Sequence, residues 1–304
     1  TTQIYTLSLH DALPISTPYT ESFTLAHAPG ASAVNTITFK SIVPRMAKLT
    51  GTASGTNAAT VSFATGTAAQ PVSWYVFDGI EFTSSPGYAV FGDQYTHDIE
   101  FKDCEFLANH VSRIFYVNGN NQAQRWNIHH CKFTMVNNGD GLYLSQISFW
   151  EFHHNEVDLN GCRQGVYTIN LNNAQNKWYN NIIYGPLANG SYNAALSFPA
   201  SNYENHVHHN TLVVNTATGS ALYSQGWSSG INRFHDNIVV VIGGGNCIKV
   251  YYATGGSANL GMYTADNNIY FAPGGNIGYW DTGYPTLPAW RTAVAAYKDR
   301  KSVV

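Results

Sequence analysis

The sequence predicts an all-β chain wound as a single-stranded parallel β-helix with three short strands in each coil. A phrase of alternating apolar and polar residues, as in residues 148–157, recurs along the chain. Alternation with a period of two is typical of a strand that is buried on one face. The copies recur every 24 to 31 residues without an internal helical period, which favours a β-solenoid over a helical repeat.

Each copy of the phrase has a corner residue, and five consecutive corners are asparagine. The eight corner residues are Ile80, Cys104, Cys131, Asn155, Asn181, Asn210, Asn237 and Asn268. In stacked coils these side chains lie about 4.8 Å apart, so each amide can donate a hydrogen bond to the next coil. An inward asparagine without such a partner would be a costly unsatisfied polar group. The sequence therefore predicts an asparagine ladder.

Three short phrases carry a resemblance to a known group of proteins. They are Asn-Asn-x-Ile at 180–183, His-His-Asn-x-Leu at 208–212 and Gly-Leu-Tyr-Leu at 141–144. In these phrases, and over about residues 35–298, the chain resembles the right-handed parallel β-helix repeat proteins of the pectate-lyase-like superfamily. The resemblance implies right-handed winding, secretion to the extracellular space or the periplasm, and a polysaccharide as the partner. It does not specify an activity.

The two ends of the chain look like translated sequencing-library adaptors. We expect neither to belong to the natural protein, so His10 and Asp11 are not candidate site residues. The chain then reads as a fragment of metagenomic type with one β-helix domain. The expected divisions are adaptor at 1–16, irregular first coils at 17–73, regular coils at 74–283, a turn and short helix at 284–298, and adaptor at 299–304.

Composition narrows the classes of partner. Charged residues make up 11% of the 304 residues, aromatic residues 14%, and the formal net charge is −3. This composition provides no basic field for a nucleic acid, and no apolar stretch approaches the ~18 residues of a membrane span. We therefore expect no nucleic-acid partner and no membrane span. We also expect a monomer.

The second strand of each coil is expected to point a polar column outward. Its members are Asp78, Lys102, His129, His153, Tyr179, His208, His235 and Asp266. Neighbouring histidines could hold a divalent cation, or they could form a solvated polar face. We favour the solvated face and predict no metal site and no cofactor, with a divalent cation as the alternative. Cys104 and Cys131 share the corner column, and we favour two buried thiols over a disulfide.

The first strand of each coil is expected to present aromatic and basic side chains outward. Tyrosine and tryptophan rings can stack on sugars, and their polar groups can bond to sugar hydroxyls. Beside the two tyrosines discussed next, the residues predicted to bind substrate are Phe115, Lys249, Tyr251 and Trp280. The alternative is that this stripe is covered by loops or merely exposed.

One constellation on that face can be read as catalytic. Aligning Gly141 with Gly165 places Asp140 beside Gln164 and Arg163, and it places Tyr143 one coil from Tyr167. Arginine can neutralise a uronate carboxylate, and a tyrosine phenol can act as the base or the acid of β-elimination. Asp140 could instead be the acid of a hydrolase. The alternative is that Asp140 and Arg163 are turn residues before a strand.

Two site patterns known from enzymes of this superfamily are missing from the sequence. They are the acidic calcium-binding cluster of pectate lyases and the group of catalytic aspartates of polygalacturonases. No catalytic residue is therefore carried over by motif. The reading is a secreted carbohydrate-active β-helix that cleaves a polysaccharide, as a uronate-type lyase or a glycoside hydrolase. The alternative is a non-catalytic carbohydrate-binding, adhesin-like or phage tailspike-like solenoid.

Overall fold

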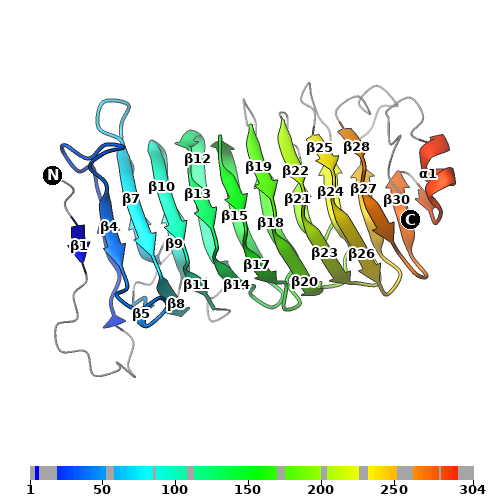
Figure 1. The fold of residues 1–304 in the computed structure, drawn as a ribbon, viewed down its shortest axis with the longest axis horizontal. Coiled ribbons are helices and arrows are strands. Elements are labelled where there is room, and N and C mark those ends of the chain that lie inside the picture. The colour runs from blue at the N-terminus through cyan, green and yellow to red at the C-terminus, as the bar shows by residue number, and fades with distance from the viewer. Residues whose placement is uncertain are drawn as a thin grey trace.

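The computed structural model describes residues 4–6, 19–52, 58–84, 87–107, 113–169, 175–199, 204–225, 232–251, 263–280 and 282–293. In this part of the chain, short strands wind through about eight turns of a parallel solenoid. Figure 1 shows the coils stacked side by side, from the blue N-terminal end to a single short helix in red at the other end. The predicted β-helix with a C-terminal helix is confirmed.

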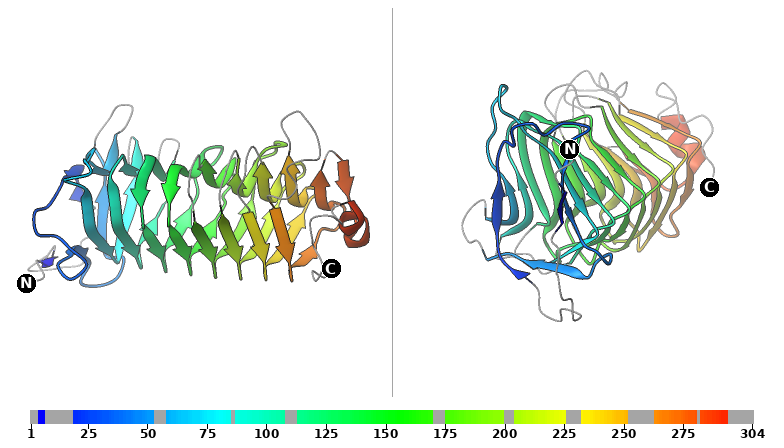
Figure 2. Two further views of the ribbon diagram at one scale, coloured as in Figure 1. Left: turned by 90° about the horizontal axis from the view of Figure 1, so that it is seen from above. Right: turned by 60° about the vertical axis from the view of Figure 1, so that its left-hand side comes forward.

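Each coil contributes three strands, and equivalent strands of successive coils pair in parallel to form three faces. The first-strand face consists of β3 (Phe23–Leu25), β6 (Ala59–Phe63), β9 (Tyr88–Gly92), β12 (Phe115–Gln124), β15 (Asp140–Ser148), β18 (Gln164–Ile169), β21 (Ala194–Phe198), β24 (Ser220–Gln225), β27 (Asn246–Tyr251) and β30 (Asn276–Trp280). The views of Figure 2 show these strands wrapping, with the other two sets, around one continuous interior.

The second-strand face joins the first around a shallow corner, because β12 pairs with both β9 and β10. It consists of β1 (Ile4–Thr6), β4 (Ile37–Lys40), β7 (Val72–Asp78), β10 (Thr96–Lys102), β13 (Asn127–His129), β16 (Glu151–His153), β19 (Asn176–Tyr179), β22 (Asn205–His208), β25 (Asn232–His235) and β28 (Tyr263–Asp266).

The third-strand face is a separate sheet of ten strands. It consists of β2 (Tyr19–Thr20), β5 (Ala47–Thr50), β8 (Ile80–Ser84), β11 (Glu105–Phe106), β14 (Lys132–Thr134), β17 (Glu156–Asp158), β20 (Ile182–Pro186), β23 (Thr211–Asn215), β26 (Ile238–Ile242) and β29 (Ile269–Phe271).

The corner between the second and third strands explains the repeated three-residue phrases of the sequence. In His208-His209-Asn210, the first residue ends the strand and points outward, and the third is buried. The middle residue adopts a left-handed backbone conformation, with a φ of 56° at His209 and 54–56° at its counterparts. The counterparts are Asp103, His130, His154, Asn180, Asp236 and Asn267. Asparagine, aspartate and histidine are the non-glycine residues that adopt this conformation most readily.

The asparagine ladder is present and continuous. Side-chain Nδ2 donates to the Oδ1 of the next coil at 3.1 Å from Asn155 to Asn181 and at 2.9 Å from Asn181 to Asn210. The remaining two steps, to Asn237 and Asn268, are 3.0 Å each. Backbone N–H groups also donate to these oxygens, so the buried amides are satisfied on both sides.

A second buried ladder lies at the opposite corner, where the second strand begins. Asn176 donates to Asn205 at 3.1 Å, and Asn205 donates to Asn232 at 2.9 Å. Sequence reasoning missed it, although each of these residues precedes the second-strand phrase at the same offset. Two amide ladders thus hold opposite corners of the same coils in register.

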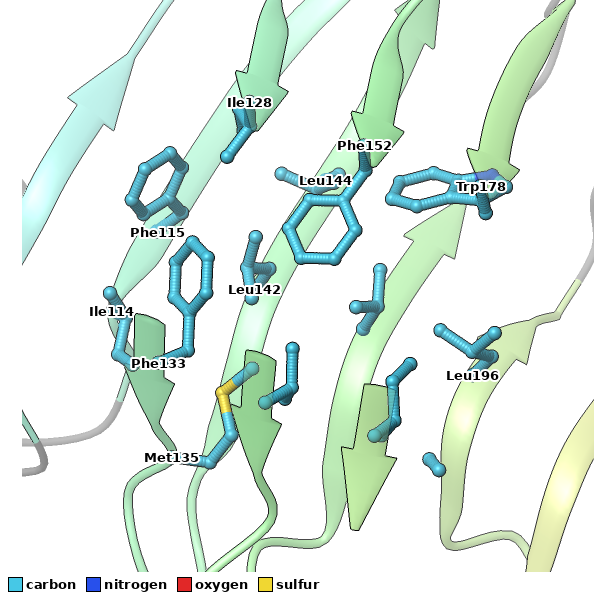
Figure 3. Packing of buried hydrophobic residues seen from close by; sticks show 14 of the residues in the cluster. Ile114, Phe115, Ile128, Phe133, Met135, Leu142, Leu144, Phe152, Trp178 and Leu196 are labelled. Atoms are coloured by element: carbon cyan, nitrogen blue, oxygen red, sulfur yellow. The ribbon is translucent and has the colours of Figure 1, made fainter. Parts of the chain in front are cut away.

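Between the corners, aromatic side chains stack along the interior in the same repeat. Phe82 stacks on Phe106 at 4.7 Å between ring centroids, and Trp126 stacks on Trp150 at 4.6 Å. Figure 3 shows how inward side chains of all three faces meet, with Phe115 among them. Because each coil buries its apolar face only against its neighbours, the core is one column rather than a sphere.

The last coil is covered by β31 (Thr282–Tyr284) and helix α1 (Leu287–Ala293). Trp290 is fully buried in this cover, and Gly278 of β30 leaves room for its ring. A side-chain carbon at Gly278 would lie 2.2 Å from the indole.

All four cysteines are free and buried, which confirms the preference for thiols over a disulfide; they are Cys104, Cys131, Cys162 and Cys247.

Within the described ranges, no helix is long and apolar enough to span a bilayer.

Candidate functional site

A single outward column on the first-strand face carries six aromatic side chains. Register pairs place its members one coil apart: Phe91, Tyr116, Tyr143, Tyr167, Ser197, Tyr223, Lys249 and Tyr279. Ring centroids are 5.3 Å apart between Tyr116 and Tyr143 and 5.2 Å apart between Tyr143 and Tyr167. These half-buried rings form a ladder parallel to the solenoid axis, which we call the tyrosine ladder (Tyr116, Tyr143 and Tyr167).

A pocket of about 290 Å³ opens beside the tyrosine ladder. Its lining consists of Arg113, Asp140, Tyr143, Arg163, Gln164, Tyr167 and Asn193. All four residues that the sequence reading assigned to catalysis therefore line one pocket. Arg113 and Asn193 were missed as site residues, because nothing in the sequence shows that their side chains turn toward the pocket.

Two arginines hold the single carboxylate of this lining. Arg113 Nη2 lies 3.2 Å from Asp140 Oδ2, and Arg163 Nη2 lies 3.1 Å from Asp140 Oδ1. Both carboxylate oxygens are thus engaged, and three charged groups leave one net positive charge in the pocket. Arg163 is also about half exposed, so part of its guanidinium faces solvent.

The tyrosines contact the same cluster. The Arg113 guanidinium lies 4.2 Å from the ring centroid of Tyr143 and 5.2 Å from that of Tyr116. Burial raises the pKa of Tyr143 and of Tyr167 above the usual value, and their tyrosine neighbours add to the shift. Both phenols therefore stay protonated at neutral pH, where they can donate hydrogen bonds but are poor bases.

Gln164 gives the pocket an unused acceptor. Its Nε2 donates to the carbonyl oxygen of Tyr192 at 2.7 Å, which fixes the amide orientation. Its Oε1 is buried and has no hydrogen-bond partner within the described structure. A buried acceptor beside a pocket is a natural partner for a ligand hydroxyl.

Lys249 lies in the outward column, as predicted, but only 5% of it is exposed. Its ammonium donates to the carbonyl oxygen of Ser191 at 2.5 Å and lies 5.1 Å and 4.7 Å from the ring centroids of Tyr192 and Tyr279. Burial lowers the pKa of Lys249. In the structure this lysine is packed among aromatic rings rather than displayed on an open surface.

Two residues predicted to face the substrate do not do so. Phe115 is fully buried in the core (Figure 3). Its neighbour Tyr116 takes the outward position, in register with Tyr143. The prediction for Phe115 was wrong by one residue. Ile114 occupies the position of Gly141, so Phe115 pairs with the inward Leu142, and a one-residue slip exchanges inside and outside.

Trp280 is displaced in the same way. Tyr279 pairs with Lys249 in the outward column, while Trp280 packs against the apolar core. The backbone of Tyr251 pairs with Gln225 in β24, and its side chain lies outside the described part of the structure.

The second-strand face presents the predicted polar column. His129 and His153 stack at 5.0 Å, and each bonds through Nδ1 to the corner histidine that follows it. Among the described residues, no three histidine, cysteine or acidic side chains are grouped so that they could hold a metal ion. The geometry of the described histidines is that of a stacked, hydrogen-bonded surface.

A second pocket, of about 500 Å³, lies where the first and second strands meet. Its lining consists of Arg125, Trp126, Asn127, Phe149, Glu151, Gln175, Lys177, Glu204 and His206. Glu151 is bonded to Lys177 at 2.7 Å, and Glu204 is bonded to Arg233 at 3.1 Å. The sequence does not reveal this pocket, because residues of successive turns build it.

No protein-family model and no curated protein matches this chain.

Proposed function

We propose that this chain is a polysaccharide-binding β-solenoid whose first-strand face holds an extended acidic glycan. The observation that carries the proposal is the tyrosine ladder with two arginines beside it. One coil is about as tall as one pyranose ring is long in an extended glycan. Successive tyrosines are therefore spaced to meet successive sugars of a chain that runs along the solenoid.

The charge of the pocket favours an acidic sugar over a neutral one. Arg113 and Arg163 outnumber Asp140, and the exposed part of Arg163 is free to meet a uronate carboxylate or a sulfate. Gln164 Oε1 and the two phenols supply the hydrogen bonds that sugar hydroxyls need. An acidic polysaccharide is an extracellular substrate, so secretion is part of the same proposal.

Binding is better supported than cleavage. A hydrolase needs a carboxyl group that can give or take a proton, and both oxygens of Asp140 are held by arginines. A lyase needs a base, and the raised pKa of Tyr143 and of Tyr167 opposes that role at neutral pH. Among the described residues, the arrangement that favours a lyase is Arg113 beside Tyr143, because the charge of the guanidinium opposes the rise in the phenol pKa. Lyase activity that appears only at alkaline pH would point to this pair.

The test is a binding panel of acidic and neutral polysaccharides with the full chain, measured by affinity electrophoresis and calorimetry. We expect acidic glycans to bind more tightly than neutral ones and their binding to weaken with salt. Arg163→Ala should weaken binding about tenfold, because a charge-assisted hydrogen bond contributes about 1.5 kcal/mol or more. Lys132→Ala, on the third-strand face, is the matched control.

Two further readouts separate the alternatives. Absorbance from unsaturated uronates would reveal a lyase, and new reducing ends without that absorbance would reveal a hydrolase. Absence of binding to every glycan in the panel would overturn the proposal. Equal binding by wild type, Arg163→Ala and Tyr143→Ala would show that the glycan does not bind to the first-strand face.

A further inference from the structure

The outer surface of the third-strand face changes abruptly from charged to apolar side chains along the solenoid. In its first outward column, the N-terminal half carries Lys48, Glu81, Glu105, Lys132 and Glu156. The same column then continues as Ile182, Thr211, Ile238 and Ile269. The neighbouring outward column changes in step, from Thr134 and Asp158 to Tyr184, Val213, Val240 and Phe271.

The apolar half of this face is exposed to solvent. Twelve large apolar side chains are exposed in the described part of the chain, and six of them lie here, with exposed fractions between 37% and 55%. These six are Ile182, Val213, Ile238, Ile242, Ile269 and Phe271, which we call the apolar plate. They come from four successive strands, β20, β23, β26 and β29, so the plate is contiguous. A contiguous patch of several hundred Å² on a protein surface marks an interaction site.

We propose that the apolar plate is a self-association surface through which two copies of this chain pack face to face. A stable interface buries about 800 Å² on each partner. The plate extends over four adjacent strands, with Thr211 and Val240 lying among its apolar members and Tyr184 and Asn215 at its edge. In a twofold dimer the same patch serves both partners. The proposal is independent of the function proposed for the first-strand face, and it replaces the monomer expected from the sequence.

The repeat itself selects a second copy as the partner. The plate consists of side-chain rows separated by the rise of one coil, so its ridges and grooves have one fixed spacing. A second copy has the same spacing and can interdigitate along the whole plate, as facing sheets do in β-sandwiches. A partner without this repeat would match only part of it.

The charged half of the face determines the orientation. If the two solenoids ran in the same direction, ion-paired residues such as Lys48 and Glu81, which are 3.0 Å apart, would be buried against their copies. Desolvating such pairs costs free energy. If the solenoids run in opposite directions about a twofold axis through the plate, apolar rows meet apolar rows and the charged halves stay in water. We therefore assign the antiparallel arrangement.

The first test is the mass of the wild-type chain in solution, measured by sedimentation velocity over a concentration series. We expect a monomer–dimer equilibrium, weakened about tenfold or more by Ile238→Lys, because the new ammonium would be buried without a partner. Thr134→Lys introduces the same charge on the same face outside the plate and should leave the dimer intact. Circular dichroism and melting curves verify that each variant is folded.

The second test reads the orientation by cysteine cross-linking under mild oxidation. The four native cysteines are buried, so they should not form cross-links between chains. Thr211→Cys, near the centre of the plate, should give a covalent dimer, and Thr134→Cys should not. Cross-linking through both positions would overturn the antiparallel arrangement. A wild-type chain that stays monomeric at its highest soluble concentration, or Ile238→Lys and Thr134→Lys with equal effect, would overturn the interface.

Discussion

At the scale of single residues, two stacked histidines on the second-strand face connect the fold to the pH dependence of its stability. His153 stacks between His129 and Tyr179, at 5.0 and 4.7 Å. His208 stacks between Tyr179 and His235, at 5.2 and 5.1 Å. Half-burial, reinforced by neighbouring histidines, lowers the pKa of His153 and of His208 to about 4. Both rings are therefore neutral in the folded protein at pH values where the unfolded chain is protonated.

This difference predicts a pH dependence of stability with a definite sign. From the ordinary histidine pKa of 6.5 down to about 4, the unfolded chain binds more protons than the folded one. The contribution of these two histidines to the free energy of unfolding should therefore be complete above pH 6.5, and it should be lost as the pH drops toward 4. Replacing both residues, as His153→Gln with His208→Gln, should flatten this slope in urea titrations at several pH values. The exposed His27→Gln serves as the control, and an unchanged slope in the double variant would contradict the assignment.

At the scale of the element, the first strands depend on glycine at their starts. Gly165 opens the segment that carries Tyr167 into the pocket, and the coils pack closely there. A side-chain carbon at Gly165 would lie 2.5 Å from the carbonyl oxygen of Ala195 and 2.8 Å from Leu159. The backbone oxygen cannot move without shifting the next coil. The glycine therefore determines both the coil spacing and the position of the pocket.

We expect Gly165→Ala to lower the free energy of unfolding by about 2 kcal/mol, because overpacking a close contact costs about 1–3 kcal/mol. Gly274→Ala is the comparison, since no atom lies within 4 Å there and only its left-handed backbone opposes a side chain. That change should cost about 1 kcal/mol. Denaturant unfolding of both variants measures the difference, and equal losses would show that coil spacing at Gly165 is not limiting.

At the scale of the whole molecule, stability comes from stacking, and the asparagine ladder connects five successive coils. Asn210 lies at its centre. Its Nδ2 donates to the carbonyl oxygen of Trp178 and to Asn237, and its Oδ1 accepts from the backbone and the side chain of Asn181. Removing this amide leaves several buried groups without partners on both sides.

Asn210→Ala should therefore destabilise the solenoid by about 3 kcal/mol or more, since each buried unsatisfied group costs about 1–3 kcal/mol. Asn215→Ala, at an exposed position of β23, should change stability by less than about 0.5 kcal/mol. Hydrogen exchange should show the loss centred on the coils around β22 and extending to both neighbours, because each coil is stabilised only by those beside it. A loss confined to a single coil would contradict a continuous ladder.

Much of the architecture was predictable because each coil of a solenoid repeats the same pattern of inward and outward residues. The second-strand outward column was predicted residue by residue, since His129, His153 and His208 occur at the same offset from the ladder corner. The first-strand register was predicted where Gly141 and Gly165 mark it, and it was wrong at Phe115, where Ile114 replaces the glycine. Asp140 and Arg163 were placed near each other by that same glycine alignment.

The sequence by itself determined the winding, the asparagine ladder and the outward column of the second strands. These properties follow from local periodicity and from the cost of burying an unpaired amide. Only the tertiary structure decided that Arg113 and Arg163 grip both oxygens of Asp140, that Lys249 is covered by aromatic rings, and that the apolar plate is exposed. Those outcomes depend on side-chain directions and on contacts between coils more than twenty residues apart in the chain, which a sequence pattern does not encode.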